Sequence, residues 1–162
     1  MAEWRIPCEK MKVSTGRDFI VPLAPQAVAL INKIRPETGF SQYLFPSPRS
    51  DKRPMSANGV LSALRRMGYT SDEMTGHGVR AMARTICAEV LDFQPEVIEE
   101  QLAHQKPGAL RDANDRTQYL KQRRKLMNDW AAYLDQLAPG VFSSRTSVAS
   151  AGKEEIPTKV AT

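Results

Sequence analysis

The sequence predicts a mainly helical domain with a small antiparallel β-hairpin at one edge. Several segments carry apolar residues at three- and four-residue steps, which is the spacing of one helix face. Two short runs near the start are rich in strand-forming residues and are separated by a polar turn. The chain has 162 residues, 41% of them hydrophobic, which is enough to bury one core.

The hairpin is expected at the start of the chain. Trp4–Pro7 and Phe19–Leu23 favour its two strands, and Gly16 in the turn supplies permissive backbone dihedrals. Lys12 lies near the tip. Because a domain seldom begins on a sheet edge, we expect further sequence upstream of Met1.

Five helices are predicted. Pro36 is expected to end the first and Gly68 the second. Between these two helices, Tyr43–Phe45 favours a brief extended segment and Ser47–Pro54 a loop. The tail 138–162 is rich in Ser, Thr, Ala and Lys and is predicted to be disordered, so residues 1–137 form the one domain. The predicted helices are Pro25–Ile34, Ser56–Met67 with Ser56 as its N-cap, His77–Leu91, Glu96–His104 and Arg116–Leu137.

Three of these helices have a marked apolar stripe that predicts their buried faces. The stripes are Val60, Leu61, Leu64 and Met67; Val79, Met82, Ile86 and Val90; and Leu120, Met127, Trp130, Leu134 and Leu137.

Charge and cysteine content narrow the class of protein. The formal net charge of +5 and the pI of about 9.4 favour polyanionic partners, although many soluble proteins are mildly basic. Cys8 and Cys87 are far apart and lack metal-ligand spacing, so we interpret them as reduced thiols of a cytosolic protein and predict no metal or cofactor. The sequence has neither a membrane-spanning apolar run nor a signal peptide.

A cationic face is predicted on the helix that begins at His77. His77, Arg80 and Arg84 fall at i, i+3 and i+7 and therefore share one side. Arginine forks onto phosphate oxygens and histidine can transfer protons, so this face suits a phosphate ligand. The simpler alternative is a helix with solvated charges.

Three elements together resemble a known family. Lys12 in a hairpin, His77-Gly78-Val79-Arg80 and Leu102-Ala103-His104 resemble the catalytic domain of the tyrosine recombinases, or phage integrases, and within them the prophage and genomic-island integrases. The resemblance covers roughly residues 3 to 137. Further similar stretches are Tyr43–Ser47, Pro54–Ser56, Leu64–Tyr69 and Arg123–Met127 with Trp130.

The resemblance implies DNA strand cleavage and rejoining on double-stranded DNA. In this family a tyrosine hydroxyl attacks a DNA phosphodiester and forms a 3′-phosphotyrosine, without a nucleotide cofactor. The resemblance assigns Lys12 as the general acid, His77 and Arg80 as contacts of the scissile phosphate, and His104 as a second histidine. It also implies tetramers on DNA, in the bacterial cytoplasm at the nucleoid, with no membrane partner.

Two features depart from the family pattern. Its other catalytic arginine would lie before Met1, and Arg5 does not match that motif. The nucleophile tyrosine would fall at Asn114, whose amide cannot attack phosphorus, so the chain as given is expected not to cleave DNA. Tyr119 is five residues further on, which on a helix is about 140° away, and we interpret it as a packing residue.

Three hypotheses remain open at this stage. The first is that the chain is a recombinase fragment that is inactive as given. The second is a DNA-binding module of the same fold that does not cleave DNA, and the third is a basic helical interaction domain unrelated to DNA. Asn114 itself fits an engineered substitution, a decayed gene or a natural DNA-binding relative. The candidate DNA-backbone contacts, each equally open to being a solvated charge, are Arg49, Lys52, Arg53, Arg65 and Arg66. We interpret Arg84 as a further DNA-binding residue that contacts a phosphate or forms a salt bridge without touching the scissile phosphate.

Overall fold

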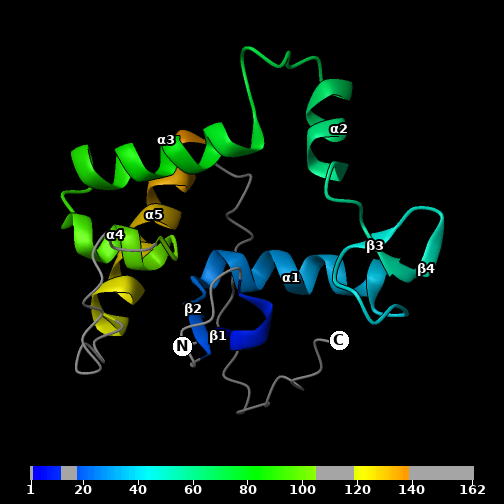
Figure 1. Cartoon of the computed structure of the whole chain (residues 1–162), viewed down its shortest axis with the longest axis horizontal. Coiled ribbons are helices and arrows are strands. Elements are labelled where there is room, and N and C mark those ends of the chain that lie inside the picture. The colour runs from blue at the N-terminus through cyan, green and yellow to red at the C-terminus, as the bar shows by residue number, and fades with distance from the viewer. Residues whose placement is uncertain (1, 12–17, 105–118, 139–162) are drawn as a thin grey trace.

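The computed structural model describes residues 2–11, 18–104 and 119–138 and confirms the mainly helical class. Within those residues it contains five α-helices and two small antiparallel sheets of two strands each (Figure 1). The predicted tail, the hairpin tip and the segment that holds Asn114 lie outside the described residues. The strands are β1 (Glu3–Ile6), β2 (Phe19–Pro22), β3 (Pro46–Ser47) and β4 (Ser50–Pro54). The helices are α1 (Pro25–Thr38), α2 (Gly59–Arg66), α3 (Gly76–Glu89), α4 (Pro95–Gln101) and α5 (Leu120–Leu137), and one 3-10 turn covers Cys8–Lys10.

The N-terminal hairpin forms as predicted. β1 and β2 pair antiparallel, with Glu3 opposite Pro22 and Ile6 opposite Phe19. β2 contacts α5, and α1 is tied to α5 by a 2.8 Å hydrogen bond from Gln26 to Asp135. The start of the chain is therefore anchored to its last described helix.

The core lies where α3, α4 and α5 meet. Cys87 of α3, Val97 and Ile98 of α4 and Leu126 of α5 are buried together. Burial raises the pKa of the Cys87 thiol to about 11, so this cysteine stays a neutral packing residue. Trp130 packs against the cluster, as its stripe predicted, whereas Leu137 at the other end of that stripe is exposed.

A buried arginine joins three elements beneath this core. Arg123 of α5 has no exposed surface; it donates to the Gln101 side chain at 2.8 Å and to the Ile20 carbonyl at 2.6 Å. Its guanidinium also lies 4.6 Å from the centre of the Phe19 ring. Arg123 therefore connects α5 to α4 and β2.

The region between α1 and α2 differs from the prediction. α1 continues past Pro36 to Thr38, because this proline sits in the last turn, where Gly39 can still donate to the Arg35 carbonyl at 2.7 Å. The predicted extended segment Tyr43–Phe45 is a series of bends. The predicted loop Ser47–Pro54 is instead most of the β3–β4 hairpin, whose polar, mainly exposed residues give no alternating apolar pattern.

α2 is shorter and more exposed than predicted. Ser56 is not its N-cap, because the Ser56 carbonyl accepts from Gly59 in a turn and the helix begins after Asn58. Gly68, with a φ of 96°, follows the end of the helix as expected. The predicted stripe is wrong at both ends, since Val60 is 56% exposed and Met67 is 67% exposed. The reason is position: α2 stands apart from the α3–α5 group (Figure 1).

α3 forms as predicted but buries a different face. Val79, Met82 and Val90 of the predicted apolar stripe are exposed. The helix instead packs through Cys87, which shares the side of Arg80 and Arg84 at four- and three-residue steps. The cationic side of α3 is therefore also its packing side. None of the helices in the described part of the chain is both long and apolar enough to cross a membrane.

Candidate functional site

The first turn of α3 positions Arg80. Thr75 precedes the helix in an extended conformation, and its side-chain oxygen accepts a 2.9 Å hydrogen bond from the Gly78 backbone, which is an N-cap. A Cβ at position 78 would lie 3.1 Å from that oxygen, so glycine suits the close approach. Arg80 consequently projects from the turn that follows a fixed helix start.

The end of α4 positions His104. Ala103 has a left-handed φ of 51°, and its N–H donates to the Glu100 carbonyl at 3.1 Å. The His104 N–H donates to the Glu99 carbonyl at 2.9 Å, which completes a Schellman motif. This motif turns the chain back over the helix, so the His104 side chain lies beside α4.

Ala103→Gly is expected to raise the free energy of unfolding by about 1 kcal/mol, because a left-handed conformation strains an L residue and not glycine. Urea unfolding followed by circular dichroism measures the change. Ala132→Gly, at an exposed position within α5, is the control and should lower stability by about 1 kcal/mol. A loss of stability in both variants would contradict the strain at Ala103.

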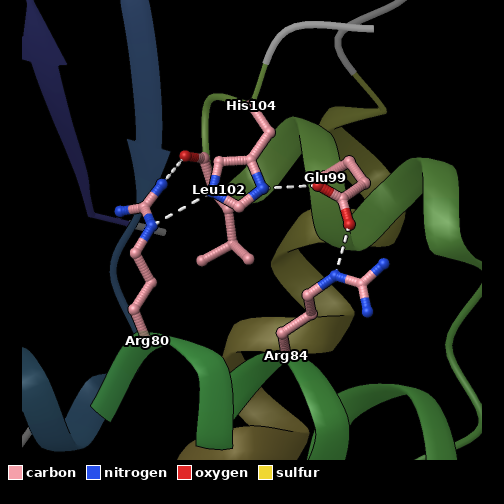
Figure 2. Close-up of polar contacts among 5 residues, drawn as sticks. All are labelled: Arg80, Arg84, Glu99, Leu102 and His104. Carbon is pink, nitrogen blue, oxygen red and sulfur yellow. Dashed lines mark hydrogen bonds and ion pairs between the residues drawn. The ribbon is translucent and has the colours of Figure 1, made fainter. Parts of the chain in front are cut away.

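Arg80 and His104 meet across the gap between α3 and the end of α4. The Arg80 Nε donates to His104 Nε2 at 3.3 Å, and a terminal nitrogen of the same guanidinium donates to the Leu102 carbonyl (Figure 2). Arg80 is exposed, so its remaining N–H donors face solvent. Two residues that are 24 positions apart thus form one polar site on the surface.

Glu99 contacts Arg84 and the ring nitrogen of His104 that does not face Arg80. Its Oε1 accepts from Arg84 Nε at 2.5 Å, and its Oε2 lies 2.5 Å from His104 Nδ1 (Figure 2). Partial burial by itself raises the pKa of the Glu99 carboxyl, but the hydrogen bonds and charges of Arg84 and His104 outweigh it and lower that pKa. The carboxylate is therefore ionised at neutral pH and accepts from both partners.

Sequence reasoning did not single out Glu99. It occurs among the glutamates of α4, and it lies five positions before His104, which is not a helical neighbour spacing. The left-handed turn at Ala103 brings the two side chains together. A histidine at a predicted helix end, with a carboxylate five positions earlier, is the pattern that indicates such a contact.

The other predicted catalytic residues are not part of this contact. His77 is exposed on the first turn of α3, and no hydrogen bond joins it to Arg80 or His104 in the described structure. Lys12 and Asn114 lie outside the described residues. Tyr119 has a left-handed φ of 47°, immediately precedes α5, and packs against the core cluster.

The predicted DNA-contact residues are spread over separate elements. Arg84 is engaged by Glu99, as described above. Arg65 donates to the carbonyls of Tyr69 and Thr70, each at 2.8 Å, and to that of Met74 at 3.0 Å, so it braces the connection from α2 to α3. The remaining four are exposed in the β3–β4 hairpin and at the end of α2; they are Arg49, Lys52, Arg53 and Arg66.

A pocket of about 200 Å³ opens beside Arg84. The lining of this pocket is mainly apolar, because the pocket lies over the edge of the core. Its apolar lining includes Cys87, Ile98, Leu126, Met127 and Trp130. The polar site of Arg80, Glu99 and His104 therefore borders an apolar hollow.

The fold agrees with the catalytic domain that the sequence motifs resemble, that of the tyrosine recombinases. Comparison with curated proteins supports the same class. Prophage integrase IntZ of Escherichia coli (strain K12) is 41% identical over 135 residues, which cover 83% of this chain and 32% of that protein. Prophage integrase IntA of the same strain is 38% identical over 130 residues, covering 80% and 30%, and the integrase of Enterobacteria phage P4 is 38% identical over 144 residues, covering 82% and 33%.

The chain belongs to the phage integrase family of tyrosine recombinases. It spans about a third of the length of the curated relatives it matches. No family model matches the chain. No solved structure matches it significantly.

Proposed function

We propose that this chain supplies the phosphate-contacting part of a site-specific DNA recombinase that integrates DNA. The single observation that carries the proposal is the contact at the protein surface between Arg80 of α3 and His104, which lies just beyond α4. Arginine and histidine together can bind a phosphodiester and stabilise the charge that develops on its oxygens. Similarity to proteins named as integrases supports double-stranded DNA as the source of that phosphate.

The proposed reaction follows the chemistry of the family. A tyrosine hydroxyl gives up its proton, which a histidine of the site accepts, as its oxygen attacks the phosphorus. The bond from phosphorus to the 5′ oxygen breaks, and Lys12 donates a proton to that leaving oxygen. Arg80 and His77 bind the non-bridging oxygens, and His104 supports Arg80 through the hydrogen bond between their side chains. The phosphotyrosine bond retains the energy for rejoining, so no nucleotide cofactor is consumed.

Asn114 bears directly on whether this chain can cleave DNA. It occupies the position where the integrase motif has its nucleophile, and a side-chain amide cannot form the covalent intermediate. We propose that the chain as given binds DNA without cleaving it. This same residue favours the second candidate function, a DNA-binding module that keeps the fold and has lost the chemistry.

The basic residues outside the site are proposed to contact the DNA backbone. Those on the β3–β4 hairpin and at the end of α2 are exposed, so they can approach a duplex and neutralise its phosphates. Self-association into a tetramer on DNA is proposed for the full-length relative. Neither assignment specifies a target sequence, because backbone contacts position a protein without distinguishing bases.

Arg80→Ala is expected to weaken binding to a duplex oligonucleotide about tenfold at low salt, because it removes a charge-assisted hydrogen bond to phosphate. The slope of log affinity against log salt should fall by about one. Fluorescence anisotropy over a salt series measures both quantities.

The matched control is Arg35→Ala, which removes the same charge from an exposed position on α1. It should change affinity about twofold or less. Equal losses in the two variants would show that Arg80 contributes only net charge, and unchanged binding in both would favour the interaction domain that has no role in DNA binding.

A further inference from the structure

The position of Glu99 between two helices suggests a specific task. Each carboxylate oxygen contacts a different partner, Arg84 on α3 and His104 beyond α4, at 2.5 Å. The Glu99 backbone carbonyl also accepts from the His104 N–H at 2.9 Å. His104 is therefore held by the same residue at its backbone and at its ring.

These contacts select one neutral tautomer of His104. The Arg80 Nε–H can only donate, so His104 Nε2 must accept with its lone pair. A carboxylate can only accept, so the nitrogen that faces Glu99, Nδ1, must carry the proton. The reversed tautomer would place a donor against Arg80 and a lone pair against Glu99.

The result is a chain of contacts from carboxylate to imidazole to guanidinium. The imidazole fixes the Nε side of Arg80, and the Leu102 carbonyl fixes one terminal nitrogen of the same group. The guanidinium plane is consequently oriented before any ligand arrives, with its unused donors toward solvent. Preorganised donors bind a developing charge better than donors that must first be ordered.

We infer that Glu99 is a positioning residue of the phosphate site: it fixes His104 as the Nδ1–H tautomer, and His104 in turn orients the Arg80 guanidinium. The inference rests on the proposed function, because it gives Glu99 a task within that DNA site. Glu99 acts through His104 and is not itself placed against the phosphate.

Glu99→Gln separates this role from simple packing. The amide has nearly the same size, but it offers one acceptor and one donor where Arg84 and His104 both need an acceptor. Either Arg84 or the ring nitrogen of His104 must then lose its partner. Glu99→Asp keeps both acceptors on a shorter stem and provides a second variant if Glu99→Gln folds poorly.

The first measurement is nitrogen NMR of the 15N-labelled full chain at about pH 8, where an ordinary imidazole is neutral. The chain has only two histidines, so exposed His77 serves as an internal control. In the native chain His104 should show a protonated Nδ1 and a bare Nε2. In Glu99→Gln the two signals should move toward the average of mixed tautomers, and in Glu99→Asp they should stay closer to the native pattern.

Glu96→Gln is the matched control for that experiment. Glu96 is exposed on the same helix, so the variant removes the same charge without touching His104. His104 signals that stay native in Glu99→Gln, or that move equally in Glu96→Gln, overturn the inference.

The second measurement is a double-mutant cycle on duplex DNA. Arg80→Ala should weaken binding about tenfold in the native chain but only about threefold or less in the Glu99→Gln background, because a misoriented Arg80 contributes less. A tenfold loss in both backgrounds overturns the inference. If Arg80→Ala has no effect in the native chain, the proposed DNA function fails and the positioning of a DNA contact fails with it, while a tautomer change in the NMR spectra would show that Glu99 still fixes His104.

Discussion

Arg123→Ala is expected to lower the free energy of unfolding by about 3 kcal/mol, the largest stability effect of any substitution considered for this chain. The guanidinium is fully buried and donates to the Gln101 side chain and the Ile20 carbonyl. Truncation leaves those acceptors without these donors, removes the contact with the Phe19 ring and opens a cavity. Chemical denaturation followed by tryptophan fluorescence measures the loss.

The neighbouring arginine provides the control. Arg124 forms an ion pair with Glu3, but its side chain is 40% exposed, so Arg124→Ala should cost at most about 1 kcal/mol. Similar losses in the two variants would mean that Arg123 does not join α5 to α4 and β2 as the structure indicates. Burial also lowers the pKa of Arg123, against an opposing effect of Glu100, yet arginine remains charged at any pH where the protein folds.

Asn114→Tyr is expected to have the largest effect on activity. The native chain should form no covalent adduct with a nicked duplex. The tyrosine variant should form one when the chain also carries the upstream segment in which the family has its other catalytic arginine. The expected gain is on the order of a millionfold in cleavage rate, the scale on which removal of a nucleophile acts. Denaturing gel electrophoresis with labelled DNA detects the adduct.

Asn114→Phe is the control, since it supplies a similar ring without the hydroxyl and should give no adduct. Binding without cleavage by Asn114→Tyr would favour the non-catalytic DNA-binding module. An adduct with the native chain would refute its inactivity. Mapping that adduct to Tyr119 would show that the residue can leave its packed position before α5.

Local sequence signals predicted helices and strands well where the backbone preferences of single residues determine the structure. Both strands of the first hairpin and the glycine after α2 follow from backbone preferences of the residues concerned. The predictions failed where polar residues formed strands, as in the β3–β4 hairpin, because exposed strands need no apolar alternation. They also failed at Pro36, where position within the last turn outweighed the general effect of proline.

Burial was less predictable than secondary structure. The stripes of α2 and α3 have helical spacing, but Val60 and Met82 are exposed, because a stripe shows which face is apolar and not whether another element covers it. α3 packs instead through the side that carries Cys87 and Arg84. Arg123 shows the reverse error, since a charged residue can be fully buried when backbone and side-chain acceptors surround it.

Residue types and their order were enough to indicate the family resemblance and the helical class, and through that resemblance they assigned Arg80 and His104 to one candidate site. Only the tertiary structure revealed Glu99, which contacts His104 and Arg84 at once. The physical reason is the left-handed turn at Ala103, which reverses the chain and brings together side chains whose spacing does not align on a helix.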